Sequence, residues 1–185
     1  PPSVLRILQH QTTGVHAPEI TGVLTHPAAA PDGHIITQPG IDASTGLFVT
    51  VSANVPCRAY TQAEAAAALQ WIRTHVLAGF RFATPLDADV AVAGILTFVQ
   101  RRLLDIAPGF AALANHQASG KTTLCRVMHL VVAGRDLPVM ALPSGESEEV
   151  EKSLLSILMR GPEAVCFDNV RGGINFHSRV LSQAM

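Results

Sequence analysis

The stretch that decides the fold is "HQASGKTT", residues 116–123. It contains Gly120, Lys121 and Thr122 in succession, the end of the pattern that marks a phosphate-binding loop between a strand and a helix. The full pattern has another glycine ahead of this tripeptide, and Asn115 stands in its place. Asn is one of the few residues besides glycine that tolerate positive φ, so the chain can still turn tightly here.

This tripeptide predicts a binding site for the phosphates of a nucleotide. Backbone N–H groups at the start of a helix surround phosphate oxygens, the lysine reaches the β and γ oxygens, and the Ser/Thr hydroxyl ligates Mg²⁺. Only two of the 13 basic residues are lysines, and Lys121 falls where a compact, flexible ammonium is preferred. We therefore expect ATP and Mg²⁺ as cofactors, Thr122 as a metal ligand, and nucleotide contacts from Ala118, Ser119, Gly120, Lys121, Thr122 and Thr123.

Strands alternate with helices on either side of this loop. Alternation of this kind implies crossover connections and a parallel sheet, and so an α/β fold. The helix after the loop is apolar nearly all round, so we expect it to be packed on both sides. The pattern predicts strands at 109–114, 137–142 and 164–169, and helices at 121–134, at 147–161 and from 175 onwards.

A carboxylate follows the third of these strands. "AVCFD", residues 164–168, places Asp168 at the tip of a buried strand, where it could hold the water shell of Mg²⁺. An Asp can also simply end a strand as a turn former. Combined with the phosphate loop, Asp168 is better explained as the second residue on the metal side of the site. Asn169 follows it directly.

The chain before the loop divides into two further regions. Residues 1–58 are rich in Pro, Gly and Thr, with short β-prone pieces at 22–24, 34–37 and 46–52, and we expect a small β-rich segment or arm. Residues 59–107 read as a helical pair, the first helix beginning at a capping box and the second after a proline. Residues 108–185 are the P-loop region.

Composition excludes several classes of protein. Of 185 residues, 48% are hydrophobic and 15% charged, and the net charge is −1, so we expect a packed core and see no basic footprint for nucleic acid. The longest apolar run, 90–99, is too short for a membrane span. Cys57, Cys125 and Cys166 are widely spaced, so no disulfide framework or zinc site is expected, and free thiols favour a cytoplasmic location.

Four parts of the chain together resemble the ATPase region of primase–helicase-like proteins carried by phages, plasmids and integrated elements. This family is similar to the AAA+ and superfamily 3 helicase ATPases. The likeness covers nearly the whole chain and departs from the usual family loop at Asn115, Ala118 and Ser119. The parts are "DGHIITQPGIDASTGLFV" (32–49), the helical pair, "ANHQASGKTTLCRVMHLVVAGR" (114–135) and "AVCFDNVRGG" (164–173).

The resemblance implies a P-loop NTPase that binds ATP and Mg²⁺ and acts on DNA in replication. It implies catalytic roles for Lys121, Asp168 and Asn169, with Thr122 and Asp168 on the metal. Asn169 stands where many relatives place a glutamate, and an amide can orient water but not accept its proton. A homo-oligomeric ring, an arginine finger and a sensor are also implied. These would follow Met185, so we expect a truncated fragment, incomplete at its C-terminus and inactive alone.

Two other functions fit the phosphate loop. One is a small-molecule kinase or another NTPase, since a fold does not fix the phosphate acceptor. The other is a degenerate domain that binds nucleotide, or nothing, and serves as an assembly module. The helicase-type sheet places a further strand between 109–114 and 164–169, whereas the kinase type sets these two strands side by side.

Overall fold

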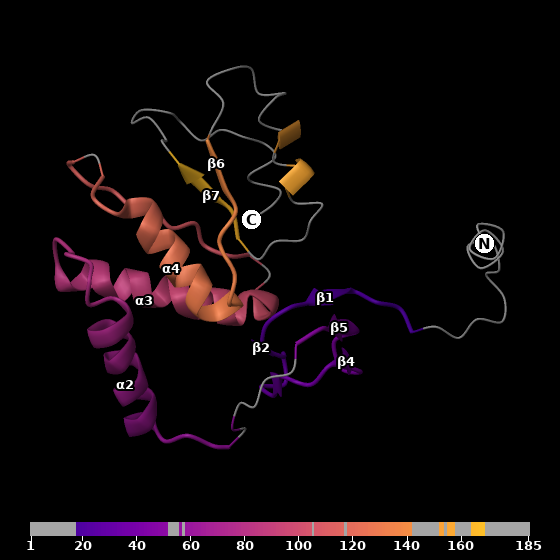
Figure 1. The fold of residues 1–185 in the computed structure, drawn as a ribbon. Helices are drawn as coiled ribbons and strands as arrows, with labels where there is room; N and C mark the ends of the chain where they lie inside the picture. The colour runs from indigo at the N-terminus through magenta and orange to yellow at the C-terminus, as the bar shows by residue number, and fades with distance from the viewer. Residues whose placement is uncertain are drawn as a thin grey trace.

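The computed structural model describes residues 18–51, 56, 58–104, 106–116, 118–141, 152–153, 155–157 and 164–168. Within these ranges a small β-rich part precedes a set of helices and a short parallel sheet (Figure 1). Asn169 and the helix expected from residue 175 lie outside the described residues.

The β-rich part contains a three-stranded sheet and a hairpin. The sheet has the order β1 (Gly22–Leu24), β5 (Leu47–Val49), β4 (Gly40–Ile41), with β1 parallel and β4 antiparallel to β5. The hairpin pairs β2 (Ala28–Ala29) with β3 (Ile35–Ile36) in antiparallel fashion. Strands thus form within all three predicted stretches, and the hairpin gains β2 from an alanine pair that the sequence did not single out.

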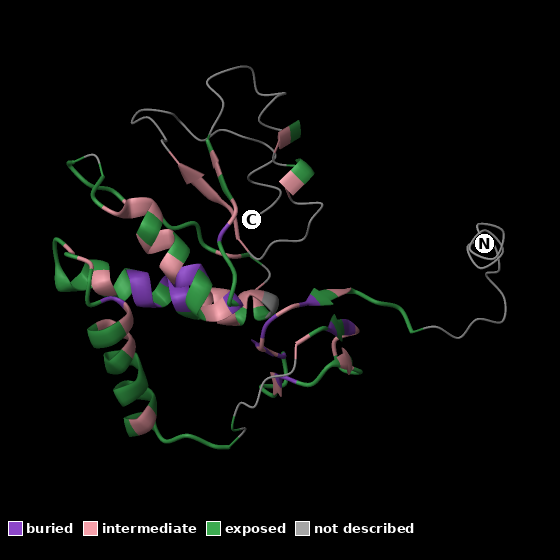
Figure 2. Cartoon of the chain, viewed as in Figure 1, coloured by how far each residue is buried: buried purple, intermediate pink, exposed green. Residues whose placement is uncertain are grey.

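This part has its own hydrophobic core, drawn in purple in Figure 2. Strand β5 alternates as the β period requires, with Leu47 and Val49 buried and Phe48 exposed between them. The core therefore lies on one face of the three-stranded sheet. Its buried members are Leu24, Ala28, Ala30, Ile36, Leu47 and Val49.

Two helices follow, as predicted. Helix α2 (Gln62–Trp71) begins at the expected capping box of Thr61 and continues into a π-helical turn, η1 (Ile72–Val76). Helix α3 (Pro85–Gln100) begins at a second capping box, between Thr84 and Asp87, and runs into a 3₁₀ turn, η2 (Arg101–Leu103).

Helix α4 (Lys121–Ala133) begins directly after the predicted phosphate loop and packs on α3. Gly94 of α3 allows the two helices to pack closely, because a Cβ at this position would lie only 2.1 Å from Cε of Met128. The expectation that α4 is packed on both sides is wrong for the described structure. Leu130 and Val131 are 50% and 48% exposed, because the packing of α4 on α3 and β7 leaves this part of the helix surface uncovered.

A two-stranded parallel sheet lies beyond α4. Strand β6 (Val139–Ala141) pairs with β7 (Cys166–Asp168), so that Ala141 lies opposite Asp168. Both strands fall within predicted ranges, and the described residues between them, 152–153 and 155–157, are helical as expected. β7 also packs against α4, which places the end of this strand beside the phosphate loop.

The predicted strand at 109–114 is not formed. These residues have no regular secondary structure, and Leu113 is 90% exposed. A strand persists only through hydrogen bonds to a neighbouring strand, and no described strand pairs with this segment. The described partner of β7 is β6 alone, so the described sheet shows neither of the two expected arrangements.

Candidate phosphate-binding site

The loop before α4 contains two residues with positive φ. Ala118 has a φ of 59° and Gly120 a φ of 83°, both in the left-handed region. Left-handed residues in a loop turn successive backbone N–H groups toward one side, which makes an anion-binding concavity. For Ala118 this conformation carries strain, because an alanine has a Cβ. Strain of this kind is concentrated at ligand-binding sites.

The start of α4 differs from the starts of the two helices before it. In α2 and α3 a threonine and a carboxylate three residues later cap the first N–H groups. Helix α4 has Gly120 as its N-cap, no hydrogen bond from a side-chain cap and no acidic residue in its first turn. The N–H groups at the start of α4 and the positive end of its helix dipole therefore favour a nearby anion.

The ammonium of Lys121 lies over this loop. Its Nζ donates to the backbone oxygen of His116 at 3.4 Å and to Oγ of Ser119 at 3.3 Å. Both acceptors belong to the loop and both contacts are long, so they are weak. Phosphate oxygens are stronger, charged acceptors, and the same ammonium can turn to them without moving the backbone.

The contact that joins the site is between Thr122 and Asp168. The Thr122 hydroxyl, in the first turn of α4, donates to Oδ1 of Asp168 at the end of β7 over 3.2 Å. The two residues are 46 positions apart in sequence. Folding therefore brings the Thr122 hydroxyl and the Asp168 carboxylate together, as the sequence predicts.

These groups fit a magnesium nucleotide. Mg²⁺ is usually held by one or two protein carboxylates together with substrate phosphates and water. Among the described residues no three His, Cys, Asp or Glu side chains gather as a metal site. Asp168 with Thr122 provides a partial oxygen set, which the phosphates of a nucleotide would complete.

The structure thus gathers Ala118, Ser119, Gly120, Lys121, Thr122 and Asp168 in one region, while Thr123 is exposed in the first turn of α4. One residue near the loop that the sequence does not indicate is Phe80. Its ring lies 3.8 Å from where a Cβ on Gly120 would be, so it packs against the loop from the segment between η1 and α3. No sequence signal links Phe80 to Gly120, since the contact joins segments far apart along the chain.

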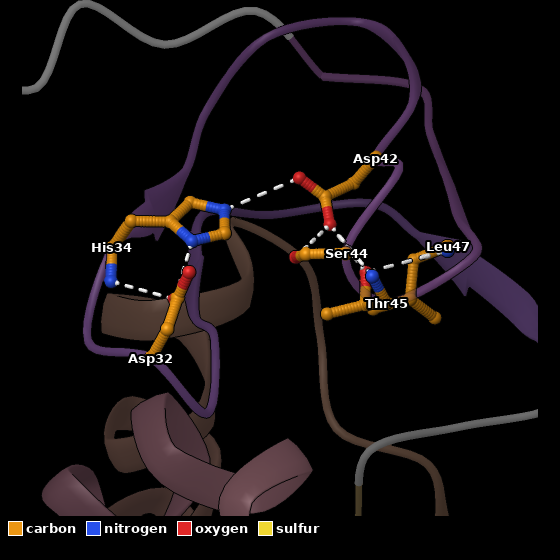
Figure 3. Close-up of polar contacts among 6 residues, drawn as sticks. All are labelled: Asp32, His34, Asp42, Ser44, Thr45 and Leu47. Atoms are coloured by element: carbon orange, nitrogen blue, oxygen red, sulfur yellow. Dashed lines mark hydrogen bonds and ion pairs between the residues drawn. The ribbon is translucent and has the colours of Figure 1, made fainter.

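A second polar cluster lies in the β-rich part (Figure 3). The imidazole of His34 contacts Asp32 through Nδ1 at 2.5 Å and Asp42 through Nε2 at 3.2 Å. These two carboxylates raise the pKa of His34, chiefly through the bond to Asp32. Oδ1 of Asp42 also accepts from the hydroxyls of Ser44 and Thr45 at 2.7 Å, which lower the pKa of Asp42.

This arrangement holds a turn and does not activate a nucleophile. The Ser44 hydroxyl donates to Asp42 and not to His34, and the lowered pKa of Asp42 makes this carboxylate too weak a base to activate the hydroxyl. Asp42 instead accepts the backbone N–H of Thr45 and bonds through its own backbone to Gly46 and Leu47. The hydrogen bonds of Asp42 therefore hold the loop before β5 in its conformation.

Comparison of the chain with protein-family models, with curated proteins and with solved structures gives no match. Within the described ranges, no helix is long and apolar enough to span a membrane.

Proposed function

We propose that this chain binds ATP with Mg²⁺ through the loop that precedes α4. The observation that carries the proposal is the 3.2 Å contact between Thr122 and Asp168. A chance Gly-Lys-Thr tripeptide gives no reason for a distant acidic strand to end beside its threonine. A phosphate loop requires this neighbour, because the metal on the phosphates is held from both sides.

Each group of the site has a distinct role in this proposal. The N–H groups at the start of α4 bind phosphate oxygens, and Lys121 neutralises the charge of the β and γ phosphates. The Thr122 hydroxyl ligates Mg²⁺, and Asp168 orients the water on the metal. Asn169, next along the chain, can orient an attacking water but cannot accept its proton near neutral pH.

Calorimetric titration of ATP and Mg²⁺ into wild-type chain and into two lysine variants tests binding. The chain has only two lysines, Lys121 and Lys152, which provides a matched pair. Lys121→Ala should abolish measurable binding, because the phosphates lose their charged partner, whereas Lys152→Ala should bind as wild type does. Equal affinity in wild type and Lys121→Ala would exclude the phosphate-loop function.

We further propose that the bound ATP drives a DNA helicase of a mobile element. The order of motifs supports this role: the Pro39-to-Leu47 motif, the helical pair, the loop and then Asp168 with Asn169. In the full-length gene product, ATP turnover should rise several-fold with single-stranded DNA, and a ring should form on ATP binding. Phosphoryl transfer to a small molecule without DNA stimulation would instead identify a kinase. ATP binding without turnover would identify an assembly module.

A further inference from the structure

Cys125 and Cys166 lie beside the proposed site, on the same two elements that form it. Cys125 is in α4, three residues after Thr122, and Cys166 is in β7, two residues before Asp168. Three residues of helix advance about 4.5 Å and two residues of strand about 6.6 Å. Both steps keep the side chain on the same face. The cysteines therefore form the next contact along the interface that begins with Thr122 and Asp168.

The elements that contain the two cysteines pack against each other. Cys125 and Cys166 each lie one step along these elements from the Thr122–Asp168 contact, and both are half-buried and free. The third cysteine, Cys57, is far from them in sequence. The neighbouring Cys166 thiol lowers the pKa of Cys125, which favours its thiolate.

We propose that Cys125 and Cys166 are a redox pair whose disulfide blocks the nucleotide site. With hydrogen peroxide as the oxidant, the Cys125 thiolate attacks the O–O bond and becomes a sulfenic acid, while hydroxide leaves and takes up a proton to become water. The Cys166 sulfur then attacks the sulfenic sulfur, the S–S bond forms, and a second water leaves. In sum, two thiols and one peroxide give one disulfide and two waters.

The coupling to nucleotide follows from the geometry. A disulfide holds its sulfurs about 2.0 Å apart and its Cα atoms within about 7 Å, much closer than a thiol–thiol hydrogen bond. The disulfide therefore pulls α4 toward β7 close to Thr122 and Asp168. The distance between these two side chains then becomes fixed. Because Mg²⁺ must be coordinated between this hydroxyl, this carboxylate and the phosphates, the oxidised chain should bind ATP with Mg²⁺ at least tenfold more weakly. This part rests on the proposed nucleotide binding.

Peptide mapping tests the disulfide without reference to nucleotide. Wild-type chain is treated with hydrogen peroxide, blocked with iodoacetamide and digested with trypsin without reductant. We expect the linked peptides 122–126 and 161–171, lost on reduction and absent in Cys125→Ser and in Cys166→Ser. Cys57→Ser is the control and should still form the link. If both cysteines are alkylated or further oxidised without linking, the proposal is wrong.

Calorimetry with ATP and Mg²⁺ tests the coupling. Peroxide should weaken binding at least tenfold in wild type and Cys57→Ser, dithiothreitol should restore it, and Cys166→Ser should be insensitive to peroxide. A linked chain with unchanged affinity would refute the block. If the reduced chain does not bind ATP at all, the proposed function fails and the block fails with it, while the peptide map still decides whether the redox pair exists.

Discussion

At the scale of single residues, the site depends on short polar side chains at the ends of elements. Gly120 ends the loop in a conformation that suits glycine, and Lys121 and Thr122 follow where α4 begins. The carboxylate of Asp168, at the end of β7, accepts a hydrogen bond from the Thr122 hydroxyl. In the proposed site Lys121, Thr122 and Asp168 act through a charge or a hydroxyl, so conservative substitutions can separate their roles.

Asp168→Asn should weaken the contribution of Mg²⁺ to ATP binding and leave the loop before α4 intact. The amide keeps the size of the side chain and can still accept from Thr122, but it lacks the charge that attracts a divalent ion. We expect ATP affinity in the presence of Mg²⁺ to fall about tenfold, or about 1.4 kcal/mol, with little change in its absence. Calorimetry measures both. Asp136→Asn, at an exposed carboxylate paired with Arg126, is the control and should change neither.

The His34 cluster should make stability depend on pH. Because its two carboxylates raise the pKa of His34 in the folded chain, the stabilisation is complete below the ordinary pKa of 6.5 and is lost as pH rises through the raised value. The pKa of Asp32 is lowered by His34, so its contribution is present above its ordinary range and is lost as pH falls through the lowered value.

The difference in melting temperature between wild type and His34→Gln should therefore shrink as pH rises from 6 to about 9. NMR titration of the imidazole provides a direct check, since Asp42→Asn removes one of the two charges and should lower the pKa of His34. A difference that stays constant over this range would contradict the ion-pair role of the cluster.

At the scale of elements, the helices differ in how they begin and in which faces they cover. The starts of α2 and α3 are closed by their own side chains, whereas α4 begins without a side-chain cap. Helix α4 buries Met128 and His129 and leaves Leu130 and Val131 exposed. The packed face holds α4 in place on α3.

Met128→Ala should destabilise the chain by about 2–5 kcal/mol, because it leaves a cavity between α3 and α4. Met128 is 5% exposed and its Cε lies against Gly94. Leu130→Ala, on the same helix but half-exposed, should cost under about 1 kcal/mol. Urea unfolding measures both. Adding Gly94→Ala should cost less in the Met128→Ala background than in wild type, since the clash is gone.

At the scale of the whole molecule, the described chain has two separate hydrophobic cores. One lies in the β-rich part around Leu24 and Val49, and the other joins Leu77, Ile95 and Met128 between the helices. The two parts meet where β2 contacts α3 and η2. This junction is small beside either core, so each part should unfold locally without taking the other with it.

Native-state hydrogen exchange tests this independence. Leu24→Ala should lower the protection of amides in β1 and β5 and leave those of α3 and α4 nearly unchanged. Ile95→Ala, at a residue 3% exposed, should do the reverse. Each should cost about 2–5 kcal/mol in its own core. Equal loss of protection in both parts after either substitution would show a single cooperative unit.

The sequence by itself determined the features that depend on near neighbours. The capping box at Thr61, the limits of α4 between Gly120 and Gly134, and the short strands at 22–24 and 47–49 follow from caps, glycines and periodicity within a few residues. The chemistry of the proposed phosphate loop is local in the same sense, because one tripeptide contains its lysine and its hydroxyl.

Only the tertiary structure decided the contacts that join distant segments. It brought Asp168 to Thr122, it packed the strand that contains Cys166 against the helix that contains Cys125, and it left residues 109–114 without the strand that their apolar character predicts. The physical reason is the range of the interactions. A helix satisfies its hydrogen bonds within its own turn, whereas a strand, a metal site or a thiol pair needs a partner that the chain supplies only by folding back on itself.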